Sequence, residues 1–286
     1  MTRAQSLVEM EAWLHSPPGR YALAWEQERL DLAVADAFGF HALQLGMPQL
    51  QALRSNRMPH RWLASDSLRV PELLELPAPG DGSLKPLSAP LGACLHCEFD
   101  ALPLPNHSID LAVLPHTLEM ARDPHLTLRE VERVLVPDGR LVITGFNPAS
   151  VWGLRQRASL AKRSMGFGKD KALFLPDPGD FIGYWRLRDW LRLLGFELES
   201  GRFGCFRPPL KTSAWLERWD WIDAVGDRWW PVLGAVYELT AVKRVRGMRL
   251  VGLLPREKRK ASAPTTVVNR DTAARALASH KLEVDV

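Results

Sequence analysis

Apolar side chains recur at helical spacing near the start of the chain, in residues 20–38. Four of them share one face of a helix: Leu23, Leu30, Val34 and Phe38. Gly39 follows directly, at a position where a helix commonly ends. We therefore expect residues 1–40 to form N-terminal helices that pack an apolar face against a core.

Short apolar segments follow, and we interpret them as strands. Seven are expected: residues 41–46, 61–66, 94–99, 109–114, 140–144, 196–204 and 237–242. The fourth and fifth of these are almost continuously apolar, which is typical of parallel strands that are buried on both faces. Residues 77–92 are rich in Pro, Gly and Ser, and they predict a loop.

The segment between the fourth and fifth strands predicts a crossover helix. Asp123 can cap such a helix and Pro124 suits its first position. The apolar residues of one face are Leu128, Val131 and Leu135. A turn at residues 137–139 then leads into the fifth strand, which makes a βαβ unit and indicates the α/β class. A second helix is expected over residues 187–194, ending at Gly195.

Two segments carry a family resemblance. Residues 100–120 read DALPLPNHSIDLAVLPHTLEM, and residues 123–148 read DPHLTLREVERVLVPDGRLVITGFNP. The order and spacing of Asp-Ala, Leu-Pro, Ile-Asp, Leu-Glu-Met and Pro-Asp-Gly resemble the middle of class I S-adenosylmethionine-dependent methyltransferases, of the type 11 kind. The resemblance implies a Rossmann-like, seven-stranded, mostly parallel sheet with helices on both faces. It also implies S-adenosyl-L-methionine as the cofactor.

The resemblance assigns candidate cofactor-binding residues at the ends of two strands. Asp100 stands where the family places the acid that contacts the adenine, with Ala101 beside it. Asp66, at the end of the second strand, is the candidate for the ribose hydroxyls. Carboxylates suit both groups because the adenine amine and the hydroxyls are hydrogen-bond donors. For Asp66, a role as a turn or cap residue is an equally good interpretation.

The loop after the first strand departs from the family pattern, which is an acid followed by glycines at three alternate positions. Here those positions hold Gln44, Gly46, Pro48 and Leu50. Gly46 is the candidate for close approach to the methionine end of the cofactor. Two functions stay open: a methyltransferase with a variant loop, or an inactive methyltransferase-fold protein that binds a partner or RNA.

His116, directly after the fourth strand, is the nearest candidate for a catalytic base. A polar residue at a strand-to-helix turn is the more common role for such a histidine. Cys94, His96 and Cys97 could suggest a metal, but the chain has no second ligand pair of the zinc-site type. We expect no metal, and we expect these cysteines to be buried strand residues.

Charge and tryptophan are both concentrated in the C-terminal half of the chain. Residues 243–260 contain eight basic residues and one acid, against a net charge of +4 for the whole chain. A solvated face is the usual role of such a run, and nucleic-acid binding through Lys243–Lys260 is the less favoured alternative. Residues 213–230 hold five tryptophans, which we expect to pack against the sheet more readily than to form an interaction surface.

Domain organisation and location can also be predicted. We expect one methyltransferase-like domain over residues 1–254, with its core at 41–244, and a basic, mobile tail over 255–286. The first residues carry acids where a signal peptide has an apolar run, and no apolar stretch reaches the roughly 18 residues of a membrane span. We expect a cytoplasmic enzyme whose substrate is a small or medium-sized molecule.

Overall fold

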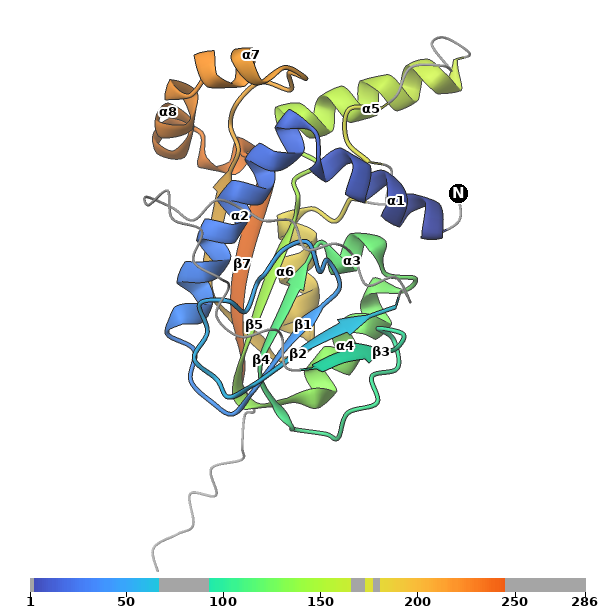
Figure 1. The fold of residues 1–286 in the computed structure, drawn as a ribbon, viewed down its shortest axis with the longest axis vertical. Coiled ribbons are helices and arrows are strands. Elements are labelled where there is room, and N and C mark those ends of the chain that lie inside the picture. The colour runs from blue at the N-terminus through green and yellow to red at the C-terminus, as the bar shows by residue number, and fades with distance from the viewer. Residues whose placement is uncertain (1–2, 67–92, 166–172, 177–180, 245–286) are drawn as a thin grey trace, which may run out of the picture. The chain divides into compact units, whose positions relative to one another are not determined.

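The computed structural model describes residues 3–66, 93–165, 173–176 and 181–244, and these residues contain one seven-stranded sheet (Figure 1). The strands are β1 (His41–Leu45), β2 (His60–Ser65), β3 (Ala93–His96), β4 (Ile109–Pro115), β5 (Leu135–Phe146), β6 (Phe196–Gly204) and β7 (Val236–Lys243). Their order is β3-β2-β1-β4-β5-β7-β6, and only β7 runs antiparallel to its neighbours. The predicted α/β class with a mostly parallel sheet is confirmed.

Helices cover both faces of this sheet (Figure 1). They are α1 (Arg3–Leu14), α2 (Pro17–Ala35), α3 (Thr117–Met120), α4 (Pro124–Val134), α5 (Val151–Ser164), α6 (Tyr184–Leu193), α7 (Ser213–Arg218) and α8 (Trp221–Trp229), with a short 3-10 helix η1 (Pro231–Leu233). Side chains of α1 and α2 belong to one buried cluster, and those of α4 and α6 belong to the other. The sheet therefore separates two apolar cores.

The central strands are apolar along their whole length because each face meets one of these cores. On β4, Val113 packs into the cluster with α1 and α2, whereas Ala112 and Leu114 pack into the cluster with α4 and α6. All three side chains are completely buried. This is the physical reason for the run without polar alternation that the sequence shows.

The crossover helix α4 begins where the sequence predicts. The Asp123 carboxylate accepts hydrogen bonds from the backbone N–H groups of His125 and Leu126, at 2.9 and 3.1 Å. The helix ends at Val134, so Leu135, expected on the helix face, instead begins β5. The predicted turn at 137–139 is an irregularity inside β5, which pairs with β4 on both sides of it.

The second helix ends earlier than its apolar spacing indicates. Phe38 was expected on the buried face, but α2 ends at Ala35 and the Phe38 side chain is 78% exposed. The chain leaves the helix to reach Asp110 of β4, whose carboxylate accepts hydrogen bonds from the N–H groups of Phe40 and His41. A Cβ at Gly39 would lie 2.4 Å from Asp110, so this close approach requires glycine.

The expectation that the tryptophans of residues 213–230 pack in the core is wrong for four of the five. Trp215, Trp221, Trp229 and Trp230 are each at least 50% exposed. The helices α7 and α8 are short, and they bury only Leu216 and Gly226. Most of the aromatic surface of this segment therefore faces outward.

Two further expectations concern strand cysteines and the basic run. Cys94 is exposed rather than buried because β3 is an edge strand, and Cys97 lies just past the end of β3 and is half-buried.

The first residue of the basic run, Lys243, is buried rather than part of a solvated face, and its ammonium pairs with Glu132 at 2.8 Å. The rest of the basic run beyond residue 244, the predicted loop at 77–92 and the predicted tail at 255–286 lie outside the described residues.

Candidate functional site

The ends of β1 and β2 and the residues after β3 meet along the carboxyl edge of the sheet. The N–H of Gly46 donates to the carbonyl of Ala64 at 2.8 Å, and the N–H of Cys97 donates to the carbonyl of Ser65 at 3.0 Å. These bonds continue the parallel pairing of the three strands past their last residues. Ligands of such sheets bind outside this edge, where the strand order reverses, which is here between β1 and β4.

The two predicted cofactor acids lie on this edge, and both are half-buried. The Asp100 carboxylate makes no hydrogen bond or ion pair with another residue in the described part of the chain, so its oxygens are available to a donor. Asp66 is close to Cys97: burial raises the pKa of the Cys97 thiol to about 11, and the charges of Asp66 and Cys94 contribute. Ala101 is exposed beside Asp100.

Gly46 has the left-handed conformation that favours glycine, with φ of 72°. A Cβ at this position would lie 3.4 Å from the ring of Phe99 and 3.6 Å from Oγ1 of Thr117. Phe99 is only 3% exposed. A side chain of the protein therefore occupies the space next to Gly46 on this side.

Gln44, which replaces the acid of the family pattern, organises the loop that follows β1. It is completely buried, and the two N–H groups of its amide Nε2 are shared among the carbonyls of Gly46, Met47 and Leu50, at 3.1, 3.0 and 2.7 Å. Its Oε1 accepts from the N–H of Ala52 at 3.1 Å. A carboxylate has no donor for three carbonyls, so this loop conformation requires the amide.

The connection from β1 to β2 contains no helix, although such parallel crossovers usually do. Residues 46–59 form turns instead, and buried amide side chains satisfy their backbone groups. Gln27 of α2 both donates to the carbonyl and accepts from the N–H of Gln51. Asn56 donates to the carbonyl of Val34 at 2.8 Å. The N-terminal helix α2 therefore supports the loop next to the candidate site.

His116 lies between two carboxylates beneath the same edge. Its Nε2 is 2.7 Å from Oε1 of Glu26, on α2, and its Nδ1 is 2.7 Å from Oε2 of Glu119, on α3. The three side chains are 1–2% exposed. A general base must reach the proton that it removes, and both ring nitrogens here are already engaged within the protein.

The carboxylates set the charge of this cluster. Burial alone would lower the pKa of His116, but Glu26 and Glu119 outweigh it and raise this pKa to about 10. Burial raises the pKa of Glu119, and the charge of His116 opposes that rise. The sequence analysis did not identify Glu26. The signal in the sequence is a charged residue on the apolar face of α2, between Leu23 and Leu30.

The site fits the adenosine part of S-adenosyl-L-methionine better than its methionine part. Asp66 and Asp100 bring two carboxylates to this edge, and carboxylates suit the adenine amine and the ribose hydroxyls because both are hydrogen-bond donors. On the other side, Gln44 uses its amide within the loop and Phe99 packs against Gly46. The residues present therefore do not form the glycine cradle of the family pattern.

The sheet order and the site at its carboxyl edge define the chain as having the fold of class I S-adenosylmethionine-dependent methyltransferases. The resemblance predicted from the sequence is confirmed, and the cofactor of this class is S-adenosyl-L-methionine. Residues 83–143 match the family model of a methyltransferase domain.

The chain is also similar to two curated proteins and to a solved structure. The chain is 29% identical over 200 residues to the uncharacterized protein YafS of Escherichia coli, covering 70% of each chain. It is 43% identical over 61 residues to a demethylmenaquinone methyltransferase of Chlamydia pneumoniae, covering 21% of this chain and 26% of that one. A SAM-dependent methyltransferase structure from Thermotoga maritima matches with a TM-score of 0.50 at 16% identity, covering 83% of this chain and 96% of that one.

Proposed function

We propose that this chain transfers a methyl group from S-adenosyl-L-methionine to a small or medium-sized molecule. The observation that carries the proposal is the pair of half-buried acids, Asp66 after β2 and Asp100 after β3, on the carboxyl edge of the sheet. The match of residues 83–143 to a methyltransferase domain supports it. Within the described residues, no helix is long and apolar enough to cross a membrane.

Each acid has a role in this proposal. Asp100 accepts from the adenine amine, and Asp66 accepts from the ribose hydroxyls. The cofactor supplies the methyl group, and Gly46 contributes less to its binding than a full glycine loop would. His116 holds α2 and α3 together rather than removing a proton, because Glu26 and Glu119 occupy both ring nitrogens. Catalysis then rests on holding the acceptor in line with the methyl group.

Calorimetry with S-adenosylmethionine and S-adenosylhomocysteine tests the proposal. Loss of a charge-assisted hydrogen bond typically costs about 1.5–3 kcal/mol, so Asp100→Asn should weaken binding roughly tenfold or more. Asp189→Asn is the matched control, because Asp189 lies on the exposed side of α6. This variant should bind like the parent protein.

The opposite result would favour the other function that the sequence left open. If folded, cofactor-free protein gives no heat and no thermal shift at millimolar ligand, the chain is an inactive methyltransferase-fold protein. A partner or RNA would then be its ligand. RNA binding through the basic run should weaken steeply as salt rises, and charge reversal at Lys258, Arg259 and Lys260 should weaken it across sequences.

A further inference from the structure

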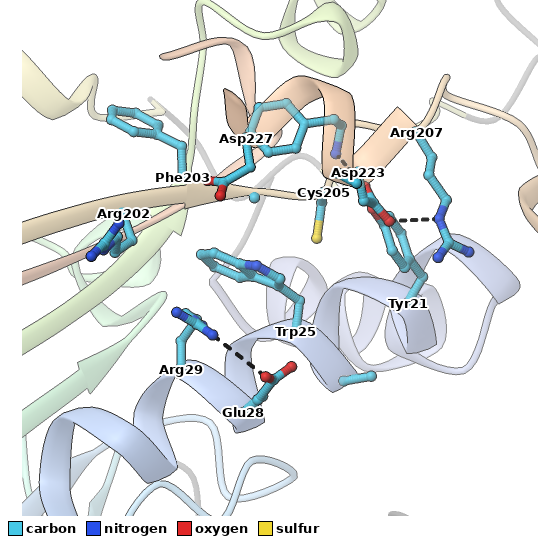
Figure 2. A pocket seen from close by; sticks show the side chains of 14 residues that line it. Tyr21, Trp25, Glu28, Arg29, Arg202, Phe203, Cys205, Arg207, Asp223 and Asp227 are labelled. Carbon is cyan, nitrogen blue, oxygen red and sulfur yellow. Dashed lines mark hydrogen bonds and ion pairs between the residues drawn. The ribbon is translucent and has the colours of Figure 1, made fainter. Parts of the chain in front are cut away.

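A cavity of about 470 Å³ opens between α2, the end of β6 and α8, away from Asp66 and Asp100 (Figure 2). Its volume is in the range of pockets that hold a small molecule. One wall comes from α2, the second from residues 202–207, and the third from α8. Nothing in the proposed cofactor site uses these residues.

The middle of the cavity is aromatic. The Trp25 ring lies directly against Gly204, where an added Cβ would come within 2.0 Å of the indole. The ring of the neighbouring Phe203 lies on the other face of β6, with its centre 5.0 Å from that of Tyr184 and 6.4 Å from that of Tyr237 (Figure 2). Only glycine at position 204 lets the indole approach the end of β6 this closely, so the backbone itself makes room for the aromatic ring.

One end of the cavity is closed by groups that satisfy one another. The Tyr21 hydroxyl donates to the Asp223 carboxylate, and Nε of Arg207 donates to the same carboxylate at 2.8 Å. The Arg207 guanidinium also lies 4.3 Å from the centre of the Tyr21 ring. These charged groups are paired with one another, so little of their hydrogen-bonding capacity remains for a ligand.

The other end carries two arginines whose donors are largely unused. Among the described residues, the Arg29 guanidinium makes a hydrogen bond to Glu28 alone, at 3.4 Å, and its buried Nε has no partner there. Arg202, at the same end, makes no side-chain hydrogen bond or ion pair with any residue that the structure describes (Figure 2). The guanidinium fork matches the geometry of a carboxylate or phosphate.

The nearby acids do not consume these donors. Glu238 lies close enough for both arginines to influence it, yet burial raises its pKa and its hydrogen bond comes from Thr240. Asp227 of α8 lines the same cavity, and it makes no hydrogen bond or ion pair with the rest of the described chain. Its carboxylate is therefore available to an N–H or O–H group of a bound molecule.

We propose that this cavity binds a small aromatic molecule that carries a carboxylate or phosphate group. The ring packs against Trp25, the anionic group lies between Arg29 and Arg202, and a hydroxyl or amine of the ligand donates to Asp227. This combination requires both an aromatic body and an anion.

Calorimetric titration with phenyl phosphate and 4-hydroxybenzoate, in the absence of cofactor, tests the proposal. Both probes should bind, and uncharged benzyl alcohol should bind at least tenfold more weakly. Arg29→Gln and Arg202→Gln should each weaken binding of the anionic probes about tenfold, as expected for a lost charge-assisted hydrogen bond. Arg157→Gln is the control, because Arg157 is an exposed arginine of α5 outside the cavity. It should leave binding unchanged.

Three results would overturn the proposal: no binding of either anionic probe, equal binding of benzyl alcohol, or full affinity in both arginine variants. Arg202 is exposed, so its variant should fold, and a melting curve verifies this. Asp227→Asn adds a second readout, because it should reduce the preference for 4-hydroxybenzoate over benzoate. Since no cofactor is present, failure of cofactor binding would leave these results unaffected.

Discussion

Gln44 fixes the turn after β1 through four hydrogen bonds to backbone groups. A glutamate would have nearly the same shape but would direct negative oxygens at the carbonyls of Gly46, Met47 and Leu50. Buried carbonyls without donors are costly. The absence of the family's acid is thus part of a different loop structure, in which the amide is the structural requirement.

This gives a prediction for Gln44→Glu, the substitution that restores the acid of the family pattern. It should lower the free energy of unfolding by about 3 kcal/mol, because a buried charge replaces a satisfied amide. Urea denaturation measures the change. Asn106→Asp makes the same chemical change at an exposed position and should have a far smaller effect. Equal stability of the Gln44 variant would show that the loop does not depend on the amide.

At the scale of elements, α2 has two faces with different tasks. One face is buried and supplies Gln27 to the β1–β2 loop and Glu26 to His116. The other supplies Trp25 and Arg29 to the cavity. One helix therefore connects the carboxyl edge of the sheet with the proposed ligand pocket.

The buried face of α2 can be tested against its exposed face. Glu26→Ala leaves His116 without one of its two partners, and loss of one member of a buried ionic cluster typically costs about 3–5 kcal/mol. Glu28→Ala removes a 69% exposed carboxylate two residues away and should change stability by less than about 1 kcal/mol. Chemical denaturation of both variants gives the comparison. Similar losses in the two would contradict the role assigned to Glu26.

At the scale of the whole molecule, buried titratable groups should make stability depend on pH. His116 has a folded pKa of about 10 against an ordinary value of 6.5. The folded state therefore holds a proton that the unfolded state has released between these two values. Burial also raises the pKa of Glu119 and of Glu238, so at lower pH these groups act in the same direction.

We expect the free energy of unfolding to fall as pH rises from 7 to 9, by about 1.4 kcal/mol per pH unit from His116 alone. The contribution of His116 is complete below pH 6.5 and lost as pH rises through its folded value of about 10. Denaturation curves across this window measure the slope. His116→Gln should remove most of it, and an unchanged slope in this variant would place the proton elsewhere.

The sequence by itself determined the architecture, because local patterns are sufficient for it. The apolar run of β4 requires burial on both faces, and the Asp123-Pro124 pair begins a helix by local capping alone. The order and spacing of motifs in residues 100–148 then indicated the family. The same resemblance assigned Asp66 and Asp100 to the cofactor, and these two roles stay predictions.

Only the tertiary structure decided which polar groups meet. Glu26 and His116 are 90 residues apart, and the sequence contains no local pattern that joins them. The same holds for the cavity, where Trp25 and Gly204 come into contact across most of the chain. Periodicity reports which face of an element is apolar, but the pairing of buried polar side chains depends on how whole elements pack together.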